Sequence, residues 1–209
     1  MVTNGGFESG LTGWTAFASN AQNYVTGTTL TPTNFNVAGP RSGSNYFLMD
    51  QFGPGYQGVY QDFTFAGNAV SAIFTYSIFN NSYSGYANNE NSSFGGGGSN
   101  QYFRVDILQS GNPLSTAAGI IVHTYLDAGP GQNNPYVDYT FDVTAALNAA
   151  GAGTYSIRFA QEQTEFFQNS GVDDVQLEVV STPEPASMVL MSTGLLGLGI
   201  VRRRRARNS

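Results

Sequence analysis

Alternating apolar and polar residues predict β-strands along much of this chain. In the segment 57–65, Val59, Phe63 and Phe65 lie on one face of an extended chain, and polar residues alternate with them on the other face. The same period of two recurs in three further segments, 102–107, 137–143 and 155–159. Such a pattern is typical of sheets with one buried face.

Four further segments complete the predicted set of strands. Residues 70–79 and 119–126 are apolar runs that predict strands buried on both faces or with poor alternation, and 45–51 and 172–180 are two more strands. About eight short strands separated by turn residues predict an all-β, antiparallel sandwich. The single helical signal is the segment 144–150, which we expect to end at Gly151.

The C-terminal segment has a different pattern. An uncharged stretch at 186–201 is followed directly by Arg202, Arg203, Arg204 and Arg205, with Arg207 beyond them. An apolar run with arginines at its end is typical of a membrane-stop helix whose positive end stays in the cytoplasm. Sixteen residues span about 24 Å, which is short for a bilayer, and a buried core helix is the alternative. The sequence therefore predicts a domain at 1–181 and a membrane segment within 182–209.

The distribution of charge also distinguishes the domain from the C-terminal segment. The chain has no lysine and no cysteine, and the region before the tail carries thirteen acidic residues against Arg41, Arg104 and Arg158, a net charge near −10. A body this acidic has no electrostatic attraction for nucleic acid. The lack of cysteine excludes disulfides, thiolate metal sites and cysteine nucleophiles.

The tail resembles the PEP-CTERM sorting signal, because Pro183, Glu184 and Pro185 precede the apolar stretch and the arginine cluster in that fixed order. The resemblance implies an exported protein that a membrane-embedded exosortase processes and delivers to the cell surface or exopolysaccharide matrix. Its parts would be the motif 183–185, a transmembrane helix at 186–201 and an arginine-rich tail at 202–209. Export needs a signal peptide, which Met1 and the residues after it do not resemble, so we expect the N-terminus to be truncated.

The domain carries a second resemblance. The opening residues 4–8 (Asn-Gly-Gly-Phe-Glu), the Leu-Thr-Gly-Trp at 11–14, the turn at 41–46 and the closing strand at 172–177 are similar to galactose-binding-like jelly rolls. Carbohydrate-binding modules of families 4, 9 and 22 have this form. The resemblance implies a jelly-roll sandwich over residues 1–181, and it says less about activity because the fold serves many functions.

A structural calcium ion is a further expectation. Asp173 has the same parity as the apolar residues Val175 and Leu177, and a carboxylate that faces a core must be paired, protonated or bound to metal. The jelly-roll resemblance implies Glu8 and Asp173 as calcium ligands, with Asp174 as the alternate. Oxygen ligands suit calcium. The alternative is that Glu8 and Asp173 only accept hydrogen bonds from turns.

Aromatic residues in loops are the candidates for carbohydrate contact. Tyr83, Tyr86 and Phe94 lie in the Gly- and Asn-rich segment 80–101, and Phe166 and Phe167 lie in the loop before the last strand. Aromatic faces can stack on sugar rings. The alternative is an insertion that binds no ligand.

Catalysis has little support in the sequence. His123 is the single histidine, and no nucleophile elbow, zinc motif or phosphate loop occurs. Glu162 and Glu165 are the nearest carboxylate pair, but on an extended strand they would point to opposite faces. Trp14 is expected in the core. Two hypotheses remain: a non-catalytic exported protein that associates with carbohydrate, or a polysaccharide hydrolase or its accessory module.

Overall fold

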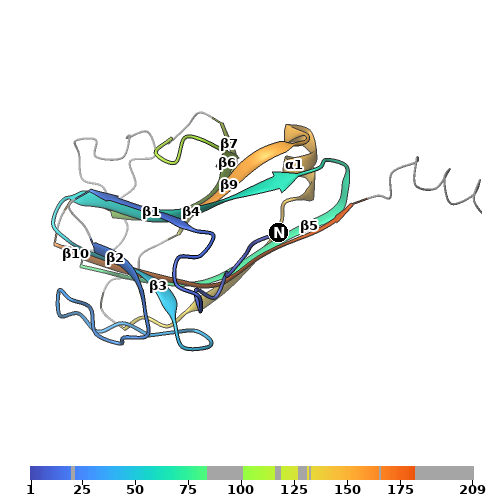
Figure 1. The fold of residues 1–209 in the computed structure, drawn as a ribbon. Coiled ribbons are helices and arrows are strands. Elements are labelled where there is room, and N and C mark those ends of the chain that lie inside the picture. The colour runs from blue at the N-terminus through green and yellow to red at the C-terminus, as the bar shows by residue number, and fades with distance from the viewer. Residues whose placement is uncertain are drawn as a thin grey trace, which may run out of the picture.

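The computed structural model describes residues 1–19, 22–83, 101–115, 119–126, 131, 133–164 and 166–181. These residues form two antiparallel five-stranded sheets packed face to face (Figure 1). The first sheet has the order β1 (Thr15–Ser19), β4 (Gly55–Phe65), β9 (Gly153–Gln163), β6 (Gln101–Gln109) and β7 (Ile120–Leu126). The second has the order β2 (Gln22–Thr26), β3 (Tyr46–Phe52), β10 (Phe167–Ser181), β5 (Ala69–Ser82) and β8 (Val137–Asp142). The predicted antiparallel sandwich is confirmed.

The eight predicted strands are all present, and two strands at the sheet edges were not predicted. β1 and β2 have five residues each, and their sequences Thr-Ala-Phe-Ala-Ser and Gln-Asn-Tyr-Val-Thr alternate poorly. Both lie at the outer edge of their sheets, beside β4 and β3 respectively. An edge strand needs little apolar character, so its pattern is weak.

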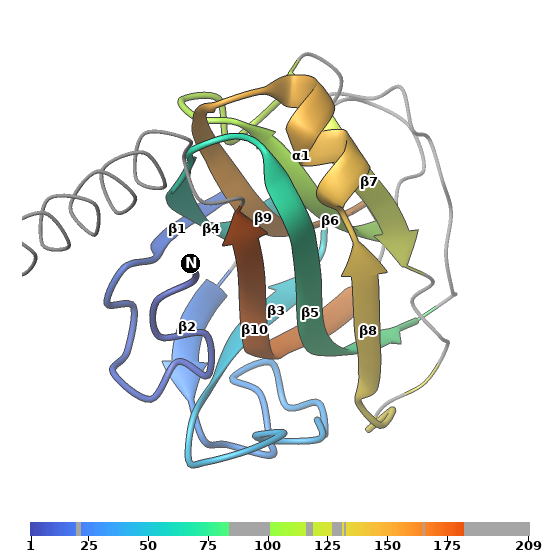
Figure 2. The same ribbon diagram turned by 90° about the vertical axis from the view of Figure 1, so that its right-hand side faces the viewer.

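The predicted helix is α1 (Thr144–Ala150), which lies at one end of the sandwich (Figure 2). Asp142 accepts a hydrogen bond from the Thr144 amide, and the buried Leu147 joins the core. The helix ends at Gly151, whose φ of 86° is open to glycine and whose N–H donates to the Leu147 carbonyl. The predicted C-cap is therefore confirmed.

The interior has an apolar half and a polar half. Around α1 the space between the sheets is filled by aromatic and aliphatic side chains such as Phe74, Tyr76 and Phe159. Trp14 belongs to this core: its ring lies 5.1 Å from that of Phe7, and its Nε1 donates to the Asn4 carbonyl, as expected. Towards the opposite end, the inward positions of the central strands carry glutamines instead.

A β-bulge in β10 corrects one prediction. Val172 and Val175 are both core residues although three positions separate them, because the register of β10 against β5 shifts between Asp173 and Gln176. Asp174 has a φ of 52° at this bulge. Asp173, next to Val172, therefore lies on the face of β10 opposite that core residue, where it is buried against the backbone of Arg41 and Ser42. The parity counted from Val175 was wrong.

Within the described residues, no helix has the length and apolar character needed to cross a membrane. The expected sorting motif Pro183, Glu184 and Pro185, the helix at 186–201 and the cluster Arg202 to Arg205 lie outside those residues.

Candidate functional site

Exposed aromatic rings gather at the end of the sandwich opposite α1. Phe52 is 63% exposed, Tyr83 is 55% exposed and Phe166 is 50% exposed, whereas Phe167 between them is 7% exposed. The Tyr83 and Phe166 ring centroids lie 4.0 Å apart, and Phe35 stacks on Phe167 at 4.0 Å and on Phe52 at 6.2 Å. We call these five residues the aromatic ledge. Exposed apolar patches of this kind mark binding surfaces more often than isolated exposed residues do.

Two tight turns present the ledge. Phe166 lies between β9 and β10 with a φ of 56°, a strained conformation for a bulky residue, and Gly53 follows Phe52 with a φ of 91°. The Gly53 N–H donates to the Phe166 carbonyl at 2.6 Å, so the two turns are joined directly. The Tyr83 N–H donates to the Phe167 carbonyl at 3.1 Å, which ties the end of β5 to the same place.

Buried glutamines connect the two sheets beneath the ledge. Four of them donate a side-chain N–H to a main-chain carbonyl of the facing sheet: Gln163 to Gln51, Gln161 to Gln168, Gln168 to Tyr102, and Gln101 to Phe167. The fifth, Gln51, accepts one of these bonds through its main-chain carbonyl. We call Gln51, Gln101, Gln161, Gln163 and Gln168 the amide zipper; all five are buried. Since hydrogen bonds depend on direction as well as distance, the zipper restricts the relative position of the two sheets more than apolar contacts would.

The sequence predicted part of this site. The structure brings Tyr83, Phe166 and Phe167 together, whereas Tyr86 and Phe94 lie outside the described residues. Phe167 was expected in a loop, but it is the first residue of β10 and is buried. Phe35 and Phe52 were not predicted. The available signal was the pair Phe52-Gly53 at a turn, but their place beside Phe166 depends on the tertiary fold.

The predicted calcium ligands surround one loop. Glu8 Oε1 accepts the N–H groups of Ser44 and Asn45, both at 2.9 Å. Asp173 Oδ2 accepts the N–H groups of Arg41 and Ser42, at 2.9 and 3.1 Å. Both carboxylates therefore accept hydrogen bonds from a turn, as the alternative to calcium binding expects.

Asp174 completes this group, because its Oδ1 accepts the Ser42 hydroxyl at 2.6 Å. Among the described residues, no group of three or more acidic or histidine side chains is placed to hold a metal ion. Calcium binding by Glu8, Asp173 and Asp174 stays a prediction, which melting curves with calcium and with a chelator would test.

Burial dominates the electrostatics of Asp173. It raises the pKa of this carboxyl from 3.8 to about 6, although the backbone N–H groups of Ser42, Asp174 and Arg41 oppose the shift. Asp138, exposed on β8, shows the reverse behaviour. Its hydrogen bond with Arg41 lowers its pKa to about 2.

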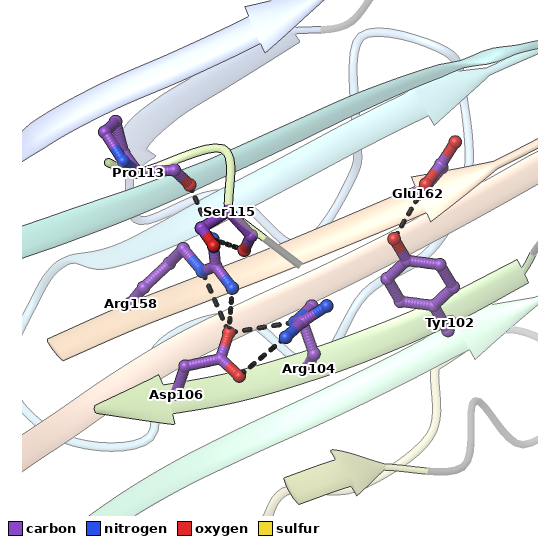
Figure 3. A network of polar contacts seen from close by, with 7 residues as sticks. All are labelled: Tyr102, Arg104, Asp106, Pro113, Ser115, Arg158 and Glu162. Carbon is purple, nitrogen blue, oxygen red and sulfur yellow. Dashed lines mark hydrogen bonds and ion pairs between the residues drawn. The ribbon is translucent and has the colours of Figure 1, made fainter. Parts of the chain in front are cut away.

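A second polar group lies on β6 and β9 of the first sheet (Figure 3). Asp106 bridges two guanidinium groups, those of Arg104 and Arg158, and all three side chains are buried. Arg158 Nη1 also donates to the carbonyls of Pro113 and Ser115, at 2.6 and 2.7 Å. Burial lowers the Arg158 pKa from its ordinary value. This network fastens the described part of the loop after β6, and its three charged side chains are buried.

The predicted carboxylate pair is only partly described. Glu162 is buried and accepts the Tyr102 hydroxyl at 2.7 Å (Figure 3). Glu165 and the side chain of His123 lie outside the described residues.

Comparison with a family model identifies the tail. Residues 181–205 match the PEP-CTERM protein-sorting motif, as the order of their features predicted. No curated protein matches the chain in sequence.

Solved structures share the fold of the domain. TmCBM61, solved in complex with β-1,4-galactotriose, has a TM-score of 0.50 and 10% identity over 85% of this chain and 97% of its own. The enzymatically active domain of tailspike protein 4 of bacteriophage CBA120 has a TM-score of 0.51 and 9% identity; 86% of this chain matches 21% of that one. A xylan-binding domain of family 22 has a TM-score of 0.47 and 14% identity over 85% of this chain and 93% of its own. The domain is thus an antiparallel two-sheet sandwich that resembles carbohydrate-binding modules, and identities this low show the fold alone.

Proposed function

We propose that this protein is exported, anchored and released through its PEP-CTERM tail, and binds carbohydrate through the aromatic ledge without cleaving it. Two findings support the general class: the sorting motif at 181–205, and a fold that carbohydrate-binding modules share. An exosortase-type membrane protease is then the processing partner. The cell surface or the exopolysaccharide matrix is the expected destination.

The ledge is the observation that carries the proposal. Phe52, Tyr83 and Phe166 expose half or more of their surface, and hydrogen bonds hold the turns that present them. The C–H face of a pyranose ring is apolar, so it packs on an aromatic face and leaves its hydroxyls in water. A platform that is already ordered loses little conformational entropy when it binds.

The charge of the domain selects among glycans. The thirteen acidic residues before the tail repel anionic polysaccharides, so we propose a neutral glycan as the ligand. The open ledge leaves most of a sugar in water, so the affinity should be modest.

Alanine substitution tests the proposal. The full chain in mild detergent is assayed against arrayed neutral glycans, and we expect Phe166→Ala and Phe52→Ala each to weaken binding about tenfold, which corresponds to ~1.4 kcal/mol. Val180→Ala is the control, because Val180 is 59% exposed at the far end of β10. Unchanged affinity in both ledge variants would remove the ledge from the proposal. Release of reducing sugar from any bound glycan would contradict the non-catalytic proposal and favour a hydrolase.

A further inference from the structure

We propose that Gln163 is the positioning residue of the ledge: its buried side chain joins the turns that carry Phe52 and Phe166, and so fixes where the Phe166 ring lies beside Tyr83. This inference rests on the proposed function for its effect on binding, but its structural part can be measured without a ligand. Gln163 is the last residue of β9 and is fully buried.

The contacts of Gln163 carry the inference. Its Nε2 lies within hydrogen-bonding distance of three main-chain carbonyls: Gly53 at 3.2 Å, Phe166 at 2.5 Å and Gln51 at 3.4 Å. Gly53 follows Phe52 directly. One amide group therefore holds both turns of the ledge to each other and to the second sheet.

Gln51 supports the same turn. Its side-chain N–H also donates to the Gly53 carbonyl, at 3.2 Å. The Gly53 carbonyl is thus held by one glutamine from each sheet, since Gln51 lies on β3 and Gln163 on β9.

An apolar residue of equal volume would fill the space but could not replace these bonds. Methionine packs without a preferred direction, whereas an N–H donor fixes the angle at which each carbonyl, and so each turn, is held. The positive φ of Phe166 is a strained conformation, and it persists only where the surrounding structure holds it. Without Gln163 the Phe166 turn should relax, and the ledge would then have to be ordered on binding.

Gln163→Met is the test, with Gln61→Met as the matched control. Gln61 is another buried glutamine of the first sheet, but its amide pairs with the backbone of Thr3, away from the ledge. Both variants lose buried hydrogen bonds, so both should lower the melting temperature. Only Gln163→Met should weaken the nuclear Overhauser contacts between the Tyr83 and Phe166 rings in the free full-length chain.

Binding supplies the second measurement, with β-1,4-galactotriose, cellotetraose and xylotetraose as probes. Gln163→Met should weaken the binding of any probe at least tenfold, but less than twofold in a chain that already carries Phe52→Ala and Phe166→Ala. Gln61→Met should leave binding within twofold. If Gln163→Met does not fold, Gln51→Met takes its place, with the same expectation.

The outcomes separate the two proposals. Unchanged contacts between the Tyr83 and Phe166 rings in Gln163→Met would overturn the positioning role, whether or not the probes bind. Lost ring contacts together with no binding of any probe by the native chain would support positioning and count against the proposed function. Equal weakening of binding by Gln61→Met would show a general effect of stability and would also overturn the positioning role.

Discussion

Single residues decide how the loop at 41–45 closes over two carboxylates. Gly43 has a φ of 60°, and a Cβ at this position would lie 2.4 Å from Glu8 Oε1, the atom that accepts the Ser44 and Asn45 amides. The jelly-roll resemblance implied Glu8 as a calcium ligand, with hydrogen bonds from a turn as the alternative. The main-chain donors that hold it could not be seen before the loop was placed.

Gly43→Ala should destabilise the chain more than a positive φ alone explains. Alanine in the left-handed region costs about 1–2 kcal/mol, and displacing Glu8 from two amides adds about 1–3 kcal/mol. Gly10→Ala is the control, because Gly10 has a φ of 64° but nothing within 4 Å of its added Cβ. Urea unfolding measures both variants, and equal losses of stability would show that the contact with Glu8 is unimportant.

Asp173 should make the free energy of unfolding depend on pH. Its folded-state pKa of about 6 lies above the ordinary value of 3.8, so the folded chain binds this proton more tightly than the unfolded chain. The stabilisation is complete below pH ~3.8 and is lost as the pH rises through ~6.

Urea unfolding between pH 4 and 7 tests this, with Asp173→Asn as the comparison. Native stability should fall with rising pH relative to the variant, which lacks the titrating group. Burial also raises the pKa of Asp50, but Asp50 is present in both proteins, so its contribution to the pH dependence cancels in the comparison. A pH dependence that is the same in the two proteins would contradict the shift.

At the scale of elements, the sequence predicted strands better than the contacts between them. Alternation marked four strands, because burial of one face imposes the period; apolar runs and turn residues marked the other four, and Gly151 marked the end of α1. Alternation could not show the bulge after Asp173, which reverses parity inside β10. The sequence pattern also could not show the ledge, since Phe35, Phe52 and Phe167 meet only after the fold has formed.

The charged network between β6 and β9 should be essential to the first sheet. Asp106→Asn removes the carboxylate between Arg104 and Arg158 and leaves two buried cations facing a neutral amide, which typically costs about 3–5 kcal/mol. Asp142→Asn is the control, because Asp142 is exposed and asparagine can also accept the Thr144 amide. Comparable urea midpoints for the two variants would contradict this role.

At the scale of the whole molecule, β10 separates the ledge from the tail. The strand begins at Phe167 in the ledge and ends at Ser181, where the matched sorting motif begins (Figure 1). Fifteen extended residues span about 45–50 Å. While the chain is anchored, this arrangement should hold the ledge away from the bilayer and towards extracellular glycan.

Fluorescence energy transfer can test this orientation cleanly, because the chain contains no cysteine and a single introduced one is labelled alone. The full chain is reconstituted in vesicles with acceptor lipids, with a donor on either Val180→Cys or Phe52→Cys. Val180 lies next to the tail and Phe52 lies in the ledge, so transfer should be strong from the first and weak from the second. Equal transfer from both sites would mean that the sandwich lies along the membrane, and the ledge would then meet lipid headgroups as readily as glycan.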